Sequence, residues 1–422
     1  MKQHLSIAVV GGGVAGITAA FLLQKKHHVT LYEKNDYVGG HTNTVTISSG
    51  PDSGLRVDTG FIVMNDRTYP LFSRFLSSLG VKTSKTDMSF SYYCRMTGLQ
   101  YGSSGLNSLL AQRKNILNPG YWRFLGEITR FFKVVQKRLK DGSLKGLTLA
   151  EFIRQKKFSS RLTDNYLLPM SAAIWSSSDR DIMGFPMESF ARFYDNHGLL
   201  SARKHPQWYF VTGGSRTYVE AFLKQFSGQV FTGSPVQSLR RDDSGVSIRT
   251  ADGSRKVFDA VVIAVHADEA LKLLEDPSEQ EHLLLSPWRY SNNMVYLHND
   301  TSLLPPNPRA RSSWNTIRDH GHRSESPITV TYHMNRLQKL QSRTDYCVTL
   351  NPSRPVAEKH ILDSMLYTHP VFSFAAMDTQ SGLNELNGKR HTWFCGSYFG
   401  YGFHEDAVRS SVAVGRQFGV NL

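Results

Sequence analysis

The chain contains few cysteines and no long apolar run. Its three cysteines, Cys94, Cys347 and Cys395, are scattered, and none has the C-x-x-C spacing of a zinc or redox site. This pattern excludes a disulfide framework and indicates a reducing compartment. No apolar window approaches the ~18–20 residues that a membrane span needs. The short N-terminal apolar run leads directly into a glycine-rich turn, so we do not expect it to be a signal peptide. We therefore expect a cytoplasmic protein without a metal site.

Acidic residues are also scarce relative to basic ones. The chain has 49 Lys and Arg against 35 Asp and Glu, a net charge of +14. Basic and apolar residues are interleaved over residues 130–157, which is typical of a solvated helix face. The alternative is peripheral docking on an anionic membrane surface. No motif for DNA or RNA binding accompanies the charge, so nucleic acid is not an expected partner. The basic residues of this stretch are Arg130, Lys133, Lys137, Arg138, Lys140, Lys145, Arg154, Lys156 and Lys157.

The most informative motif lies within the first 33 residues. An apolar run over residues 5–10 is followed by G-x-G-x-x-G at Gly11, Gly13 and Gly16, then by an Ala/Leu-rich segment and a second apolar run that ends at Glu33. This order predicts strand, tight turn, helix and strand of a dinucleotide-binding fold. The first glycine permits the turn, the second admits a pyrophosphate, and the third allows close helix–strand packing.

Two further features of this motif point to a bound dinucleotide. Val14 and Ala15 open the predicted helix, so their amide groups can point at the phosphates, and the helix dipole adds to the attraction. Glu33 follows Gly16 by seventeen positions, where its carboxylate can accept hydrogen bonds from ribose hydroxyls. The sequence therefore predicts that these residues bind the nucleotide part of a cofactor.

Residues 34–44 resemble the second fingerprint of the flavin amine-oxidase superfamily, in which an acid is followed by R-x-G-G-R and a small hydroxyl residue. The two glycines are present, whereas Tyr37 and His41 stand where the pattern usually has arginines. The loss of two fixed charges makes ordinary amine-oxidase chemistry a less expected function. The positions that the resemblance places at the cofactor are Lys34, Gly39, Gly40, His41 and Thr42.

Two internal segments are also expected at the cofactor. Residues 55–63 read as a strand broken at Gly60, and a glycine in a strand often marks close approach by a ligand or another backbone. In the superfamily this segment returns toward the flavin ring, which implies contacts by Gly60 and Phe61. The residue that matches Val236 touches the adenine side of the cofactor through its backbone, so the resemblance implies the same for Val236.

The C-terminal segment gives the second strong signal. Residues 391–418 predict a strand that ends at Gly396, a glycine-rich loop, and a final helix that begins near His404 or Glu405. A helix N-terminus there can stabilise negative charge on the flavin pyrimidine as the ring accepts a hydride. The first and last segments would then close on one cofactor, which favours FAD over NAD. The expected contacts are Gly396, Ser397, Phe403 and His404.

Together these segments predict an α/β fold of the amine-oxidase or glutathione-reductase type. A chain of 422 residues exceeds what one core normally serves. We expect a Rossmann-like FAD-binding domain with a parallel sheet, and a discontinuous α+β substrate domain with a helical insertion. Apolar residues at 167–175 and 185–194 fit core packing or, alternatively, the lining of an apolar tunnel. The FAD-binding domain is expected over 1–81, 205–290 and 385–422, and the substrate domain over 82–204 and 291–384.

Narrower motifs occur at residues 39–41, 115–119, 297–300, 331–338, 348–352 and 402–406. Together they resemble one branch of the superfamily, and the resemblance covers essentially the whole chain. This branch includes bacterial FAD-dependent proteins encoded beside cyclopropane-fatty-acid-synthase-like methyltransferases and the N-terminal half of plant cyclopropane synthases. Its bacterial members include a desaturase in the route to methylated and furan fatty acids. The resemblance implies a fatty-acyl or phospholipid substrate and a lipid methyltransferase as partner.

The implied reaction is dehydrogenation of a methyl-branched or unsaturated acyl chain. A C–H bond gives a hydride to flavin N5 while a base removes a neighbouring proton. The candidate bases are His404, His298 and Tyr332. Two alternatives remain: an amine or polyamine oxidase of the same fold, against which the positive net charge argues, and a noncatalytic flavoprotein that binds a methyltransferase.

Overall fold

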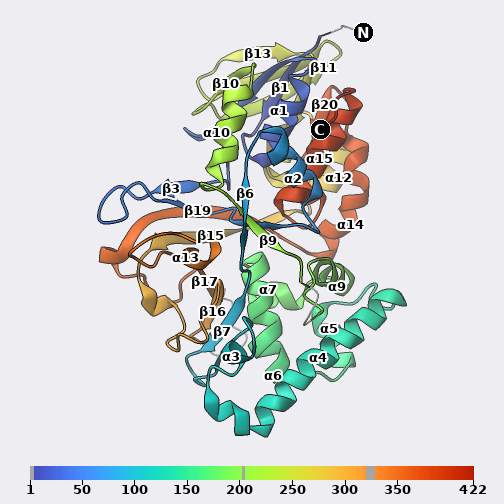
Figure 1. The fold of residues 1–422 in the computed structure, drawn as a ribbon. Coiled ribbons are helices and arrows are strands. Elements are labelled where there is room, and N and C mark those ends of the chain that lie inside the picture. The colour runs from blue at the N-terminus through green and yellow to red at the C-terminus, as the bar shows by residue number, and fades with distance from the viewer. Residues whose placement is uncertain (1–3, 202–204, 320–327) are drawn as a thin grey trace.

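A parallel sheet forms the centre of the upper half of the molecule (Figure 1). The computed structural model describes residues 4–201, 205–319 and 328–422. The five strands of this sheet lie in the order β10-β2-β1-β14-β20, and all four neighbouring pairs are parallel. This confirms the predicted Rossmann-like sheet. The strands are β1 (Ser6–Val10), β2 (His28–Tyr32), β10 (Gln229–Phe231), β14 (Ala260–Ile263) and β20 (Thr392–Phe394).

Helices cover this sheet and bring the chain ends together. Helix α1 (Val14–Leu23) is buried along its whole length, as expected for a helix that is apolar on all sides. It packs against the last helix, α15 (His404–Gln417), which also contacts α2 (Pro70–Ser78). Helix α10 (Arg216–Gln225) lies against α1 as well. The predicted final helix is therefore confirmed, and it starts at His404.

A small antiparallel sheet comes after β10 in the chain, and two helices come after β14. The sheet has the strand order β11-β12-β13. Its strands are β11 (Val236–Asp242), β12 (Gly245–Thr250) and β13 (Arg255–Phe258), and the helices are α11 (Ala267–Leu273) and α12 (Glu279–Leu285).

A seven-stranded mixed sheet lies in the lower half of the molecule, with the order β19-β15-β18-β17-β16-β7-β8. Strands β7 and β16 pair in parallel although more than 200 residues separate them, and the other pairs are antiparallel. Strand β8 pairs with β7 at the edge of this sheet. The strands are β7 (Phe90–Cys94), β8 (Gln100–Gly102), β15 (Arg289–His298), β16 (Trp314–Arg318), β17 (Thr329–His333), β18 (Cys347–Leu350) and β19 (Ile361–Val371).

The predicted helical insertion forms a layer beside this sheet (Figure 1). Its longest helix, α4, begins after Asn118, whose side chain caps the helix, and Gly142 and Gly184 follow the ends of α4 and α8. None of the helices in the described part of the chain combines the length and hydropathy needed to cross a membrane. The helices are α3 (Leu106–Leu109), α4 (Pro119–Lys140), α5 (Leu149–Gln155), α6 (Ser160–Leu162), α7 (Leu168–Trp175), α8 (Asp179–Met183) and α9 (Met187–Asn196).

Short strands connect the two halves. Strand β9 (Trp208–Val211) pairs with β5 (Val63–Asn65) and β6 (Thr83–Thr86), near the middle of the view in Figure 1. Strands β3 (Thr44–Thr46) and β4 (Arg56–Asp58) form a separate antiparallel pair.

Trp175 of α7 packs against Phe185 and Phe193, with ring centroids 4.6 and 4.9 Å apart, so the apolar segments 167–175 and 185–194 form core in this structure.

Candidate FAD site

The glycine-rich turn after β1 shows a different constraint at each glycine. Gly11 has a φ of +102°, and a Cβ there would lie 2.7 Å from the carbonyl oxygen of Ala264. A Cβ on Gly16 would lie 1.8 Å from the Gly11 carbonyl oxygen. A Cβ on Gly13 would meet no described atom within 4 Å. Gly11 and Gly16 are therefore required by the protein's own packing, whereas Gly13 keeps an open space at the N-terminus of α1, where a phosphate can approach.

Glu33 lies directly after β2, beside this turn. Its Oε2 accepts a 2.7 Å hydrogen bond from the Gly12 amide, and its Oε1 accepts one of 2.8 Å from the Asn35 amide. These bonds fix the carboxylate next to the turn, where further lone pairs can accept ribose hydroxyls. Lys34 differs, because its exposed ammonium pairs with Glu269 at 2.7 Å.

The second fingerprint packs on the first. The amide of Gly39 donates a 2.9 Å hydrogen bond to the carbonyl of Gly12, and Gly39 forms an isolated bridge with Gly13. A Cβ on Gly60 would lie 2.0 Å from the carbonyl oxygen of His41, which also accepts a 2.8 Å hydrogen bond from the Phe61 amide. The close approach predicted at Gly60 is therefore made by the backbone of the second fingerprint.

His404, the first residue of α15, joins three distant parts of the chain. Its Nε2 lies 3.1 Å from the hydroxyl of Thr42 and 3.2 Å from the hydroxyl of Tyr218. Its ring stacks on that of Phe61, with centroids 3.8 Å apart. Burial lowers the pKa of His404 to about 3, so the imidazole is neutral at pH 7. The structure thus brings His404, Thr42 and Phe61 together, as the predicted closure of the chain ends requires.

The remaining predicted cofactor residues lie along the loop before α15 and at the start of β11. The Gly396 amide donates a 2.9 Å hydrogen bond to the Ser410 hydroxyl of α15, and the Gly402 amide donates one of 3.2 Å to the Ser397 carbonyl. The Phe403 ring stacks on Phe193 of α9 at 5.1 Å. Val236 opens β11 and is partly buried. Which of these residues touch FAD stays a prediction.

The other two candidate bases have partners within the seven-stranded sheet and its helical layer. His298 is buried, its Nε2 lies 2.7 Å from the Thr349 hydroxyl, and burial lowers its pKa to about 4. The hydroxyl of Tyr332 donates a 3.3 Å hydrogen bond to the carbonyl of Ala173 in α7, and burial raises its pKa. No described contact joins either side chain to His404.

A cluster of aromatic and histidine rings beside the second fingerprint was not predicted. The ring of His41 stacks on Tyr367 at 4.8 Å, and those of His369 and His266 lie 5.5 and 6.2 Å away. Tyr367 and His369 alternate on β19, and this period-two spacing was the signal available in the sequence. Burial and the neighbouring histidines lower the pKa of His41. Among the described residues these histidines do not form a group that could hold a metal ion.

His41 also leaves one polar atom unsatisfied. Its Nε2 is shielded from solvent and has no hydrogen-bond partner among the residues that the structure describes. Buried polar groups are normally paired, so this nitrogen, like the open space at Gly13, fits a site that a bound group completes. The glycine turn, the fixed Glu33 carboxylate and the helix N-terminus at His404 together define a dinucleotide-binding flavoprotein fold.

Comparison with known families identifies the class further. Residues 14–356, well over half of the chain, match the family described as flavin containing amine oxidoreductase. The chain belongs to this family, and FAD is its cofactor.

Curated relatives of differing activity match parts of the chain. An L-amino-acid oxidase of Siganus canaliculatus is 24% identical over 288 residues, which cover 64% of this chain and 52% of the relative. A coproporphyrinogen III oxidase of Bacillus subtilis (strain 168) is 24% identical over 334 residues, covering 67% of the chain and 64% of the relative. A 4,4'-diapophytoene desaturase of Staphylococcus haemolyticus (strain JCSC1435) is 29% identical over 181 residues, covering 39% and 35%. The chain thus spans about a third to two thirds of these relatives.

Solved structures share the fold over nearly the whole chain. A putrescine oxidase variant superimposes with a TM-score of 0.71 at 14% identity, covering 98% of both chains. A CLA-producing fatty acid isomerase from P. acnes gives a TM-score of 0.70 at 16% identity, covering 99% of this chain and 100% of that one. At these identities the likeness establishes the architecture.

Proposed function

We propose that the protein is an FAD-dependent oxidoreductase that dehydrogenates a methylated or unsaturated fatty-acyl chain of a phospholipid. The reaction removes a hydride and a proton from neighbouring carbons and leaves a new double bond. Oxygen or another acceptor then takes up the two electrons. The resemblance to the branch associated with lipid methyltransferases supports an acyl substrate. The similarity to a relative named as a desaturase and to the structure of a fatty acid isomerase also supports it.

The observation that carries the proposal is a neutral histidine among aromatic rings. His404 contacts Phe61 at 3.8 Å and Phe72 at 5.3 Å, and both rings are apolar. An uncharged hydrocarbon needs no counter-ion, and a dry apolar surrounding favours it. A cationic amine would instead be favoured by an acidic group free to receive it.

The carboxylates near this histidine already have partners. Glu405 accepts hydrogen bonds from the amides of Leu71 and Phe72 at 3.1 and 2.8 Å. Asp406 accepts from the amides of Tyr401 and Phe403 at 2.9 and 3.1 Å, and also pairs with Arg409. Both acids therefore stabilise the start of α15 and α2, which makes them poor receptors for a substrate ammonium group.

The buried Asp58 has a similar structural role. It accepts a 2.6 Å hydrogen bond from the Thr44 hydroxyl and one of 2.8 Å from the Ser215 amide. Gln338 donates to its other oxygen at 2.9 Å. Burial raises the pKa of Asp58 to about 6 despite these bonds. This carboxylate therefore joins β4, the start of α10 and the segment after β17, and the amine-oxidase alternative gains no receptor from it.

FAD supplies the hydride acceptor when bound. The residues that would hold it are those around the open space at Gly13, the Glu33 carboxylate and the N-terminus of α15. His404 is the base that the geometry favours, because it is the candidate base that contacts the predicted cofactor residues Thr42 and Phe61. To accept a proton, its neutral Nε2 must exchange its contacts with the hydroxyls of Thr42 and Tyr218 for one with the substrate. Phe61 and Phe72 exclude water from that ring.

Anaerobic mixing of the FAD-loaded protein with substrate tests the proposal. Phospholipid that carries a methyl-branched or monounsaturated chain should bleach the flavin absorbance, and mass spectrometry should find a product lighter by two hydrogens. Putrescine and L-amino acids serve as the rival substrates. Bleaching by an amine but not by lipid would establish the amine-oxidase alternative. No bleaching by either, together with tight co-purification of a lipid methyltransferase, would establish the noncatalytic flavoprotein.

A further inference from the structure

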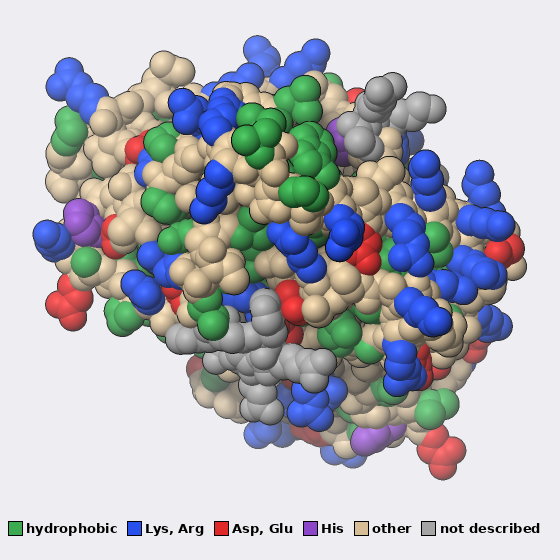
Figure 2. Space-filling model, turned by 90° about the horizontal axis from the view of Figure 1, so that it is seen from below, with side chains coloured by type: hydrophobic (Ala, Val, Ile, Leu, Met, Phe, Trp, Pro, Cys, Tyr) green, Lys and Arg blue, Asp and Glu red, His purple; other side chains and the backbone are tan. Residues whose placement is uncertain are grey.

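Four large apolar side chains are exposed together at the end of the molecule farthest from the parallel sheet. We call them the tip patch: Leu106 of α3, Ile116 and Leu117 of the short helix η1 (Arg113–Leu117), and Trp122 of α4 are exposed by 75, 45, 88 and 47%. These elements form the lower end of the view in Figure 1. Figure 2, seen from below, shows hydrophobic side chains gathered on this face with Lys and Arg around them. Such a patch beside basic residues indicates an interaction surface.

The tip patch is held in place by hydrogen bonds. The Trp122 indole donates a 2.9 Å bond to the Ile116 carbonyl, and the hydroxyl of Tyr121 donates one of 2.6 Å to the Leu109 carbonyl of α3. Leu117 and Trp122 occupy the positions of a hydrophobic staple, in which the two side chains would cover each other. An exposed fraction of 88% leaves Leu117 largely uncovered, so helix capping does not account for its apolar side chain.

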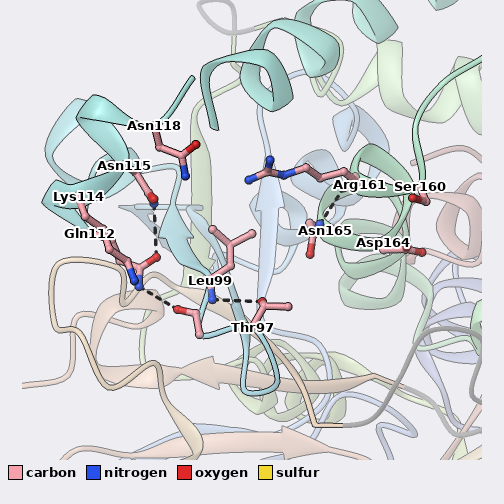
Figure 3. Close-up of a pocket in the computed structure, with 11 residues that line it drawn as sticks. Thr97, Leu99, Gln112, Lys114, Asn115, Asn118, Ser160, Arg161, Asp164 and Asn165 are labelled. Atoms are coloured by element: carbon pink, nitrogen blue, oxygen red, sulfur yellow. Dashed lines mark hydrogen bonds between the residues drawn. The ribbon is translucent and has the colours of Figure 1, made fainter. Parts of the chain in front are cut away.

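A polar cavity of about 420 Å³ opens beside the tip patch (Figure 3). Lys114 and Asn115 of η1 line one wall, and Arg161 of α6 extends toward them from the other. Arg161 also donates a 3.0 Å hydrogen bond to the Gly120 carbonyl, which fixes its guanidinium at the start of α4. Two cations and several amide groups make this cavity suited to a phosphate group and its polar substituents.

One carboxylate, Asp164, also lines the cavity. It interacts electrostatically with the buried Arg318, so it is partly neutralised from the protein side. A second carboxylate nearby, that of Glu127, is also engaged by the protein, because it accepts a 2.7 Å hydrogen bond from the Ser159 amide. Asp164 and Asn165 belong to a π-helical turn (Thr163–Leu167), and such turns occur frequently at functional sites.

The basic stretch 130–157 has no large exposed apolar side chains of the kind that form the tip patch. Phe131 and Val135 are buried, and the half-buried Phe132, Val134 and Leu139 pack against the core. Its basic residues therefore form a solvated face of α4 and α5, as the ordinary interpretation expects. Within α3 to α6, the large apolar side chains that are exposed beside basic residues are those of the tip patch.

We propose that the tip patch docks on an anionic phospholipid bilayer and that the adjoining cavity receives a lipid phosphate. Leu106, Ile116, Leu117 and Trp122 would enter the headgroup and acyl boundary, while Lys114 and Arg161 contact the phosphate. Trp at such a boundary is common because its ring is apolar and its N–H is polar. The inference rests on the proposed function, because docking would bring a lipid substrate to the protein. Binding to the bilayer itself does not depend on the dehydrogenation reaction.

Sedimentation of the FAD-loaded protein with vesicles tests this docking. Vesicles of equal phosphatidylglycerol and phosphatidylcholine should bind it, and Leu117→Asp should weaken binding at least tenfold. Leu283→Asp is the matched control, since Leu283 is 69% exposed on α12, and it should bind as the unchanged protein does. Lys114→Gln should weaken binding several-fold, more than Lys133→Gln on the solvated face of α4.

Three outcomes would overturn the docking proposal: no binding of the unchanged protein, equal binding by Leu117→Asp, or a larger loss for Lys133→Gln than for Lys114→Gln. Trp122→Phe keeps an apolar ring and serves as a second variant that should retain most of the binding. Flavin bleaching with detergent-dispersed phospholipid separates this inference from the proposed function. A protein that binds vesicles but is not bleached refutes the reaction alone, and one that is bleached but does not bind vesicles refutes the docking alone.

Discussion

The hydroxyl of Ser411 in α15 donates a 2.8 Å hydrogen bond to the carbonyl of Ala15 in α1. These two residues lie at opposite ends of the chain, and both are buried. Nearby, a Cβ on Gly415 would lie 3.1 Å from Leu22, so a small residue lets the two helices approach closely. The last helix therefore supports the first, as the predicted closure of both chain ends on one cofactor requires.

Two alanine substitutions in the turn should separate folding from cofactor binding. Gly16→Ala places its Cβ 1.8 Å from the Gly11 carbonyl oxygen, so the turn must move and the protein should lose stability. Gly13→Ala meets no described atom within 4 Å, so the apoprotein should unfold at nearly the unchanged temperature. The methyl group of Gly13→Ala would nevertheless occupy the space into which we expect the phosphate of FAD to fit. We expect at least a tenfold loss of FAD affinity, measured by flavin fluorescence; full FAD content in Gly13→Ala would contradict this.

Replacement of His404 should slow flavin reduction without removing FAD. His404→Leu keeps a side chain of similar bulk against Phe61 but cannot accept a proton. General base catalysis typically contributes 10²–10⁴-fold, so we expect the rate of flavin bleaching by lipid to fall by about that factor. Stopped-flow absorbance measures the rate, and the flavin-to-protein absorbance ratio controls for occupancy. A variant that bleaches at the unchanged rate would remove His404 from the chemistry.

The sequence was sufficient to predict the parts of the fold that depend on local patterns. The G-x-G-x-x-G turn, the buried strand before it and the acid at the end of the next strand lie within 33 residues, so spacing alone predicts their geometry. The start of α4 also has a local cause, because the Asn118 side chain caps the helix and Pro119 occupies its first position. The position of α15 needed the family resemblance, because local patterns do not show which helix lies against α1.

Other features depend on contacts between distant segments. The parallel pairing of Phe90 with Trp314 joins strands more than 200 residues apart, and no local signal specifies it. The ring cluster at His41 combines residues from β19 and from the loop before α11. His298 was a reasonable candidate base by residue type, but its partner Thr349 lies on the neighbouring strand, so only the register of β15 and β18 shows that the imidazole is engaged there.

The free energy of unfolding should decrease as the pH is lowered, partly because of His298. Its Nδ1 accepts a 3.1 Å hydrogen bond from the Asp300 amide, so Nε2 carries the proton and donates to Thr349. A second proton would place two donors face to face. The folded pKa of about 4 lies below the unfolded value of 6.5, so the unfolded state binds the proton more readily. The stabilisation is complete above pH 6.5 and is lost as pH falls toward 4; at pH 5 the loss is about 2 kcal/mol.

The variant His298→Gln isolates this contribution. Glutamine can still donate to Thr349 but does not titrate. Urea unfolding at pH 7.5 and pH 5 should show that the loss of unfolding free energy between the two is about 2 kcal/mol smaller in the variant. His282 is exposed on α12, so His282→Gln is the control and should leave the difference unchanged. An equal pH dependence of His298→Gln and the unchanged protein would show that His298 binds protons equally in the folded and unfolded states, so that its pKa is not lowered by folding.

A buried ion pair attaches the helical layer to the seven-stranded sheet. Arg318, at the end of β16, donates hydrogen bonds of 2.9 and 3.2 Å to the two carboxylate oxygens of Asp179 in α8. Both side chains are buried, so removal of one partner leaves a charge without its counter-ion, which typically costs about 3–5 kcal/mol. Asp164 also interacts with Arg318, so Asp179→Ala should lie near the lower end of that range.

Among the described residues Arg318 is the cation that pairs with Asp179, so Arg318→Met should be the more destabilising single change. The double variant with Arg318→Met and Asp179→Leu removes both charges and fills much of the same volume, so it should be more stable than either single variant. Urea unfolding followed by circular dichroism gives the coupling free energy from the four proteins. Additive losses in the double variant would show that the two side chains contribute independently and that the pair does not hold α8 on the sheet.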